Sequence, residues 1–171
     1  MRTLDPAEAK KALAPDDGWE EPSEAGPVRH DVAYVPWEPR DGGGLALRCY
    51  RRRADSQVRA RVWFGPATEG PPGHVHGGAL VTAFDHVLGA AAWFAGHPSF
   101  TARLEYDFRS MVPLGSVALV EGWVAEAGER KVKVEGRLLD AGGHLLGEGH
   151  AIMVKMTREH LAGFQRRFAG G

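Results

Sequence analysis

Gly70-Pro71-Pro72-Gly73-His74-Val75-His76-Gly77-Gly78 leads directly into an apolar segment at residues 79–94. That segment contains no proline, one interior glycine (Gly89) and an apolar side chain at nearly every position. A helix that is apolar on all sides is a buried helix, so the pattern predicts a long core helix here. The rest of the chain is expected to fold around it.

Two features of this predicted helix indicate chemistry. Asp85 lies near its middle, and a carboxylate among apolar side chains usually has a partner or a task. Gly77 and Gly78 stand at its start, where backbone N–H groups are unpaired and the helix dipole is positive. We predict an oxyanion site at the glycines and a base or nucleophile at Asp85. In the alternative interpretation, Thr82 or His86 merely satisfies a buried Asp85, and the glycines merely begin the helix.

Composition limits the possible functions. The chain has 171 residues, enough for one domain with a proper core, and a formal charge of −1, which gives no reason to expect a nucleic-acid partner. A single cysteine, Cys49, excludes an intrachain disulfide and favours a reducing compartment. We identify no signal peptide, and the longest apolar run is shorter than the ~20 residues that cross a bilayer. We therefore expect a cytoplasmic protein that does not bind membranes.

The segments around the helix have the pattern of β-strands. Apolar and polar residues alternate at 100–109 and 131–139, as expected for half-buried strands. Further strands are predicted at 45–52, 57–64, 116–125 and 144–156. Short turns make consecutive strands antiparallel neighbours. The expected fold class is therefore α+β, with a curved antiparallel sheet wrapped around one long central helix.

The chain divides into three parts by composition. Residues 1–44 are rich in proline, glycine and acidic residues, and we interpret them as an N-terminal arm that is partly flexible, with a short helix at 5–14, an extended segment at 32–37 and a linker at 41–44. Residues 45–156 form the folded domain. Residues 157–171 are expected to be a short C-terminal helix and tail, capped by Thr157.

These motifs resemble those of the hotdog-fold acyl-CoA thioesterases. The likeness rests on the 70–78 stretch, on Asp85 nine positions after the second histidine, and on Phe100-Thr101-Ala102 at the start of the long alternating strand. It covers residues 45–156 and is greatest to the branch with a His-Gly-Gly motif, which includes phenylacetate-pathway thioesterases. One departure is Gly70, where many relatives have asparagine; this puts an asparagine-dependent mechanism in doubt.

The resemblance implies an enzyme that hydrolyses acyl-CoA to a free acid and CoA, without a cofactor or metal. It implies that Asp85 is the general base or nucleophile, and that the backbone at Gly77 and Gly78 polarises the thioester carbonyl. His76 then corresponds to the histidine that orients this turn, and Thr101 to the hydroxyl residue that positions the attacking water.

Other side chains are candidates for substrate contacts. Aromatic residues near the helix end are plausible walls for the acyl group, and arginine forks match the phosphates of CoA. A solvated strand surface is the alternative explanation for Arg109 and for the cluster of Arg51–Arg53, Arg59 and Arg61. His74 and His76 have the spacing of a metal pair, but Asp85 is too far along the helix to join them easily. The predicted substrate-binding residues are His74, Thr82, Trp93, Phe100 and Arg109.

The spacing within the helix also predicts an assembly. Gly78 and Asp85 are seven residues apart, about 10 Å along a helix axis, so one chain cannot bring both to one carbonyl. We expect a homodimer with shared active sites, itself paired into a homotetramer as a dimer of dimers. Two alternatives are a hotdog hydratase or dehydratase, which is disfavoured because Asp85 and His86 point about 100° apart, and a non-catalytic module that binds acyl-CoA or acyl-carrier protein.

Overall fold

The computed structural model describes residues 8, 11–20, 44–52, 54 and 57–168, with the side chains of 164–168 excepted. Within the expected helix at 5–14, residues 8, 11 and 12 are helical, and the others of that segment are in turns or outside the described residues. The expected extended segment at 32–37 and most of the linker at 41–44 also lie outside the described residues.

The predicted helix and strands are confirmed, with ends that differ by two residues or fewer. The elements in chain order are β1 (Trp19–Glu20), β2 (Leu45–Arg52), β3 (Val58–Phe64), the 3₁₀ turn η1 (Pro66–Thr68), α2 (Gly77–Phe94), β4 (Ser99–Phe108), β5 (Val117–Ala127), β6 (Lys131–Leu139), β7 (Leu145–Lys155) and α3 (Arg158–Phe168). The sequence interpretation did not include β1 or η1. No helix in the described part of the chain combines the length and hydrophobicity needed to cross a bilayer.

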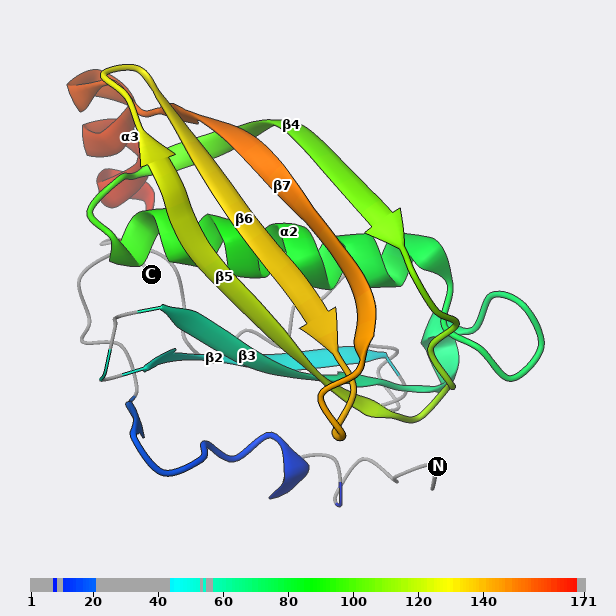
Figure 1. The fold of residues 1–171 in the computed structure, drawn as a ribbon. Coiled ribbons are helices and arrows are strands. Elements are labelled where there is room, and N and C mark those ends of the chain that lie inside the picture. The colour runs from blue at the N-terminus through cyan, green and yellow to red at the C-terminus, as the bar shows by residue number, and fades with distance from the viewer. Residues whose placement is uncertain (1–7, 9–10, 21–43, 53, 55–56, 169–171) are drawn as a thin grey trace.

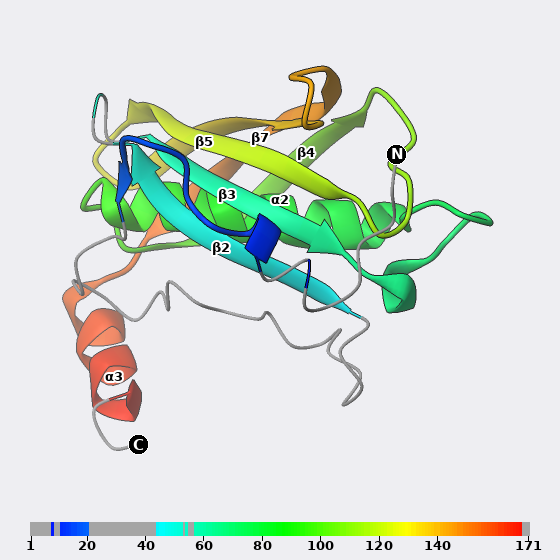
Figure 2. The same cartoon turned by 90° about the horizontal axis from the view of Figure 1, so that it is seen from below.

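The strands form one antiparallel sheet in the order β1-β2-β3-β5-β6-β7-β4. The sheet curves around α2, with β5, β6, β7 and β4 on one side of the helix and β2 and β3 below it (Figures 1 and 2). Among the described strands, this order leaves β4, although it is long, at the edge of the sheet with only β7 beside it.

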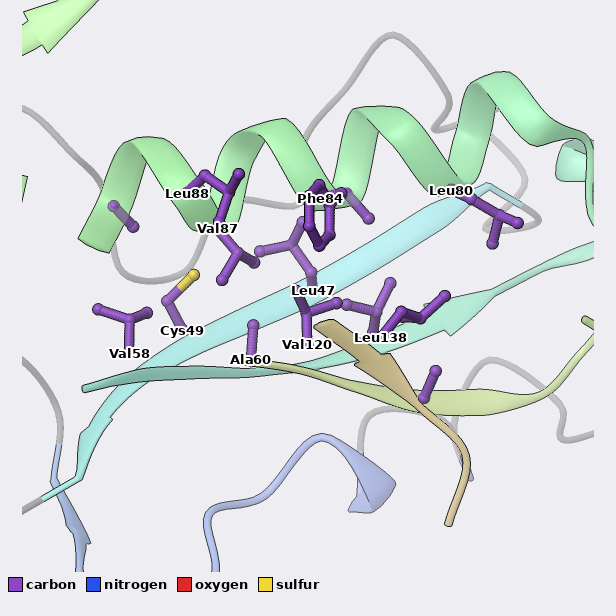
Figure 3. Close-up of a cluster of buried hydrophobic side chains, with 14 of the residues drawn as sticks. Leu47, Cys49, Val58, Ala60, Leu80, Phe84, Val87, Leu88, Val120 and Leu138 are labelled. Carbon is purple, nitrogen blue, oxygen red and sulfur yellow. The ribbon is translucent and has the colours of Figure 1, made fainter. Parts of the chain in front are cut away.

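One side of α2 packs against the concave face of the sheet. Leu80, Phe84, Val87 and Leu88 point from the helix toward the strands, where they join apolar side chains of β2, β3, β5 and β6 in one core cluster (Figure 3). All four side chains are buried. Burial of this side of the helix removes apolar surface from water and so stabilises the domain.

A row of glycines brings the helix close to the sheet. Gly122, Gly136 and Gly149 face one another across β5, β6 and β7. A Cβ atom on Gly136 would lie 2.6 Å from the carbonyl oxygen of Glu121 and 2.7 Å from a methyl group of Leu88. The absence of a side chain at Gly136 therefore allows α2 and the strand backbone to approach.

Residues 13–20 cover part of the outer face of the sheet. Leu13 packs on Trp63, and the Tyr50 hydroxyl donates to the Leu13 carbonyl at 2.7 Å. Trp19 lies over the guanidinium groups of Arg59 and Arg61. Arg59 and Arg61 also pair with acidic residues, Arg59 with Glu121 at 2.5 Å and Arg61 with Asp16. Both guanidinium groups are thus held by partners on the outer face of the sheet.

Candidate functional site

The start of α2 is held in place by His76. This residue is the N-cap of the helix, and its Nδ1 atom accepts a hydrogen bond from the Gly78 N–H at 2.9 Å. The N–H of Gly77 has no acceptor among the described residues. Of the two predicted oxyanion glycines, Gly77 is therefore the one whose N–H is available to a ligand, at the positive end of the helix dipole.

The loop before the helix explains the glycine at position 70. A Cβ atom on Gly70 would lie 2.7 Å from the Cα atom of His76. The loop is closed by hydrogen bonds from Gly70 N–H to the His74 carbonyl, at 2.9 Å, and from His76 N–H to the Thr68 carbonyl, at 2.7 Å. An asparagine at position 70 would require this loop to move away from the helix start.

Asp85 and Thr101 meet across the space between α2 and β4. The Thr101 hydroxyl donates to an Asp85 carboxylate oxygen at 2.8 Å, and Asp85 is half-buried. Thr82, which the alternative interpretation paired with Asp85, donates to the Gly78 carbonyl at 2.8 Å. Burial lowers the pKa of the His86 imidazole, and the neighbouring Asp85 carboxylate partly opposes this.

A β-bulge in β4 determines which side chains face the helix. The pairing of β4 with β7 shifts between Thr101 and Arg103, so Ala102 is an extra residue. Thr101 pairs with the buried Met153, and Leu104 pairs with the buried Ala151, so both face the core side. Phe100 is adjacent to Thr101 in the strand and therefore points to the outer face, away from Asp85.

A cavity of about 300 Å³ lies beside the helix start. Its walls come from the loop before α2, the first turn of α2 and the segment that follows β4; they include His74, Gly77, Leu80, Phe108, Arg109 and Met111. The Phe108 ring lies directly over Gly77, since a Cβ atom there would be 3.1 Å from the ring. Phe108 and Met111 are nevertheless 57% and 61% exposed, which is unusual for large apolar side chains.

The structure brings together some of the predicted site residues and separates others. His74, Gly77 and Arg109 line the cavity, where Arg109 also pairs with Glu148 at 2.9 Å. Trp93 lies near the far end of α2 and donates from Nε1 to the Ser99 carbonyl at 3.2 Å. Phe100 is on the outer face, as described above.

The sequence interpretation did not include three of the apolar cavity residues, Leu80, Phe108 and Met111. Of these three, Phe108 could have been found from the sequence, because it is the last apolar residue of the alternating strand. Nothing in the sequence marks Leu80 or Met111 as different from core or loop residues.

The predicted oxyanion donor and the carboxylate of one chain are far apart. Helix α2 runs without interruption from Gly77 to Phe94, so Asp85 lies eight residues, or about 12 Å, from Gly77 along the axis. A single carbonyl cannot contact both groups of the same chain.

Comparison with known proteins agrees with this architecture. Residues 72–146 match the family model described as Thioesterase superfamily. A solved thioesterase superfamily protein, 29% identical, superposes with a TM-score of 0.61 over 64% of this chain and 54% of that chain. The domain has the hotdog fold. A hypothetical thioesterase from Streptococcus pneumoniae, solved with coenzyme A, superposes at a TM-score of 0.59 over 66% of this hotdog chain and 86% of that chain; at 17% identity it supports the fold alone.

A curated relative matches the central part of the chain. The acyl-coenzyme A thioesterase THEM4 of Xenopus laevis is 33% identical over 93 residues, which is 54% of this chain and 42% of that protein. The chain thus spans less than half the length of this relative.

Proposed function

We propose that this hotdog protein is an acyl-CoA thioesterase that hydrolyses its substrate to a free acid and CoA. The observation that carries the proposal is the Thr101–Asp85 hydrogen bond of 2.8 Å, which orients a half-buried carboxylate. The open N–H of Gly77 supplies the polarising donor for the thioester carbonyl. Asp85 then activates a water molecule or attacks the carbonyl, and the CoA thiolate leaves.

The active site is shared between two copies of the chain. Strand β4 has ten residues, and one of its edges is unpaired in the described part of the chain, which makes it a ready template for pairing with another strand. Pairing of two β4 edges around a two-fold axis joins the sheets and sets the two α2 helices antiparallel. Each helix start then lies near Asp85 of the second copy, which removes the separation of about 12 Å found within one chain.

Similar proteins support this assignment. THEM4 of Xenopus laevis is named an acyl-coenzyme A thioesterase, and one of the solved relatives contains coenzyme A. That streptococcal protein has also been solved with alanine replacing an aspartate and, separately, a threonine 16 positions further along. Asp85 and Thr101 are separated by the same 16 positions.

Release of free thiol from a series of acyl-CoA substrates tests the activity. The protein's own thiol does not interfere with a thiol reagent, because Cys49 is buried and burial raises its pKa to about 12. We expect Asp85→Asn to lower turnover by about 10² to 10⁴, the range for acid–base groups. Asp17→Asn removes an exposed carboxylate outside the candidate site and is the matched control.

Two results contradict the proposal. Near wild-type hydrolysis by Asp85→Asn would exclude this carboxylate as base or nucleophile. Saturable binding of acyl-CoA by the wild type with no thiol release would identify a non-catalytic binding module instead.

A mixed dimer tests the shared site. We expect Asp85→Asn and Gly77→Pro to be inactive separately. Refolding them together in equal amounts makes half of the dimers hybrid, each with one intact site, so about a quarter of wild-type turnover returns. No recovery from verified hybrids would refute the cross-subunit arrangement.

Three finer assignments belong to the same proposal. Membership of the His-Gly-Gly branch is supported by the cap that His76 forms on Gly78. A cytoplasmic location is supported by the free thiol of Cys49. The dimer of dimers stays a prediction, and light scattering of the native protein measures its mass.

A further inference from the structure

Phe108 presents the edge of its ring, not its face, to the start of α2. A Cβ atom on Gly77 would lie 3.1 Å from Cε1 and 3.2 Å from Cζ of this ring, and no other atom of the ring would be within 4 Å. A ring that turned its face to this point would bring all of its carbon atoms to similar distances. The part of the side chain nearest to Gly77 is therefore the C–H edge at Cε1 and Cζ.

Two aromatic contacts fix the orientation of this ring. Phe108 makes an edge contact with Tyr106, with ring centroids 4.8 Å apart and planes at 73°. Tyr106 makes a similar contact with Phe84, at 4.8 Å and 71°, and Phe84 is fully buried in the core. Burial raises the pKa of Tyr106 to about 12, so the ring between the other two is neutral at physiological pH. The exposed ring of Phe108 is thus held from the core.

The ring edge borders the space in front of the Gly77 N–H. In a helix the Cα–Cβ bonds tilt toward the N-terminus, and the N–H bonds of the first turn point the same way. The N–H of Gly77 has no acceptor among the described residues, and Gly77 and Phe108 line the same cavity. An oxygen atom that accepts a hydrogen bond from this N–H therefore lies beside Cε1 and Cζ of Phe108.

We propose that Phe108 is a catalytic residue whose ring edge stabilises the oxyanion formed at the Gly77 N–H. The inference rests on the proposed thioesterase function. An aromatic ring is electropositive at its edge and electronegative over its faces, so the C–H bonds at Cε1 and Cζ attract a negatively charged oxygen. Such weak C–H donors add to the stronger N–H donor of Gly77.

The charge that the edge meets exists only during the reaction. When water or Asp85 adds to the thioester carbon, a new C–O bond forms and the carbonyl π electrons move onto the oxygen. When the C=O bond re-forms, the C–S bond breaks and the thiolate leaves with its electron pair. The edge therefore acts on the transition state more than on the bound substrate, and its loss lowers kcat more than it changes KM.

The proposal accounts for two unusual features of the site. A large apolar side chain is 57% exposed at the cavity, where burial does not explain its presence. The residue opposite it is a glycine, and any other side chain at position 77 would place a Cβ atom against the ring edge. The missing side chain of Gly77 thus lets the edge approach the N–H.

Fluorine at chosen ring positions tests the edge, because fluorine is only slightly larger than hydrogen. Introduced at position 108 alone, 3,4,5-trifluorophenylalanine places electronegative C–F bonds at Cε1 and Cζ. Its matched control, 2,6-difluorophenylalanine, keeps both C–H bonds there and makes them more positive. We expect the first to lower kcat for thiol release by about 3- to 10-fold with KM changed by less than about 2-fold, and the second to match or exceed the wild-type kcat.

A conventional variant gives a second measurement. Phe108→Leu keeps an apolar side chain without an electropositive edge, and we expect a loss of kcat similar to that caused by the trifluorinated ring. Thermal unfolding verifies that each protein folds, and light scattering verifies that each keeps the wild-type assembly. If Phe108→Leu does not fold, the two fluorinated proteins still decide the question.

Other results overturn the inference. Equal kcat values for the two fluorinated proteins would show that the ring edge does not contact the oxyanion, and a loss confined to KM would show that Phe108 only binds substrate.

Failure of the proposed function is distinguished by calorimetric titration of a trifluoromethyl ketone analogue of acetyl-CoA, which cannot release thiol. If the wild type hydrolyses no acyl-CoA but the trifluorinated ring binds this ketone more weakly than the difluorinated ring, the thioesterase assignment fails and the contact of the edge with the oxygen stands. If the wild type releases thiol and the two fluorinated proteins do not differ in either measurement, the thioesterase assignment stands and the role of Phe108 fails.

Discussion

Replacement of Gly77 by proline removes a single N–H group from the helix start. Proline has no backbone N–H, and position 77 is the first residue of α2, where proline is well tolerated. The preceding residue must be extended, and His76 already has φ −64° and ψ 135°. The substitution is therefore expected to leave the helix intact.

Gly77→Ala is the matched control for this variant. Alanine keeps the N–H but adds the same Cβ atom, 3.1 Å from the Phe108 ring, so both variants displace that ring. Loss of one oxyanion donor lowers kcat by about 10² to 10³, and we expect this ratio between Gly77→Ala and Gly77→Pro. Steady-state thiol release gives kcat and KM, and the melting temperature verifies folding.

A proline variant whose kcat lies within about 3-fold of that of the alanine variant would refute the assignment of Gly77 as the polarising donor. Since the Gly78 N–H is bound to His76 in the single chain, such a result would indicate that His76 releases it on substrate binding.

Three further predictions concern the hydroxyl, the sheet and one titrating group. Thr101→Val removes the hydrogen bond to Asp85 and should lower kcat by about 10-fold or more, whereas Thr101→Ser keeps a hydroxyl and should have a kcat close to that of the wild type. Equal kcat values for the valine and serine variants would contradict the role of the hydroxyl. Gly136→Ala forces a Cβ within 2.6 Å of a backbone oxygen and should cost about 1–3 kcal/mol in urea unfolding, which an unchanged midpoint would disprove. Burial lowers the pKa of His86, so the unfolded chain binds a proton at this imidazole more readily than the folded chain does. The free energy of unfolding should therefore fall as the pH drops below 6.5, and it should fall less steeply in His86→Gln. Identical pH profiles of stability in the two proteins would exclude this contribution of His86.

The sequence predicted the framework because periodicity is a local property. The apolar run at 79–94 and the alternation at 131–139 gave the central helix and a strand with ends close to those observed. Short turns correctly gave the antiparallel neighbours β2–β3, β5–β6 and β6–β7, but the expectation that β4 lies beside β5 is wrong, because β4 pairs with β7 and β5 pairs with β3. Strand β1 was beyond this reasoning, since its two residues are too few to show a period.

The sequence by itself determined that one carboxylate, one pair of glycines and a long helix belong together, and that seven residues separate Gly78 from Asp85. Tertiary structure decided which groups are usable. The alternation at 100–108 predicts that Phe100 shares a face with Phe108, but the extra residue Ala102 reverses the phase. Thr101 therefore reaches Asp85, and Phe100 points outward. A bulge depends on how two strands pair, and the alternation of apolar and polar residues within one strand does not determine its pairing with a distant strand.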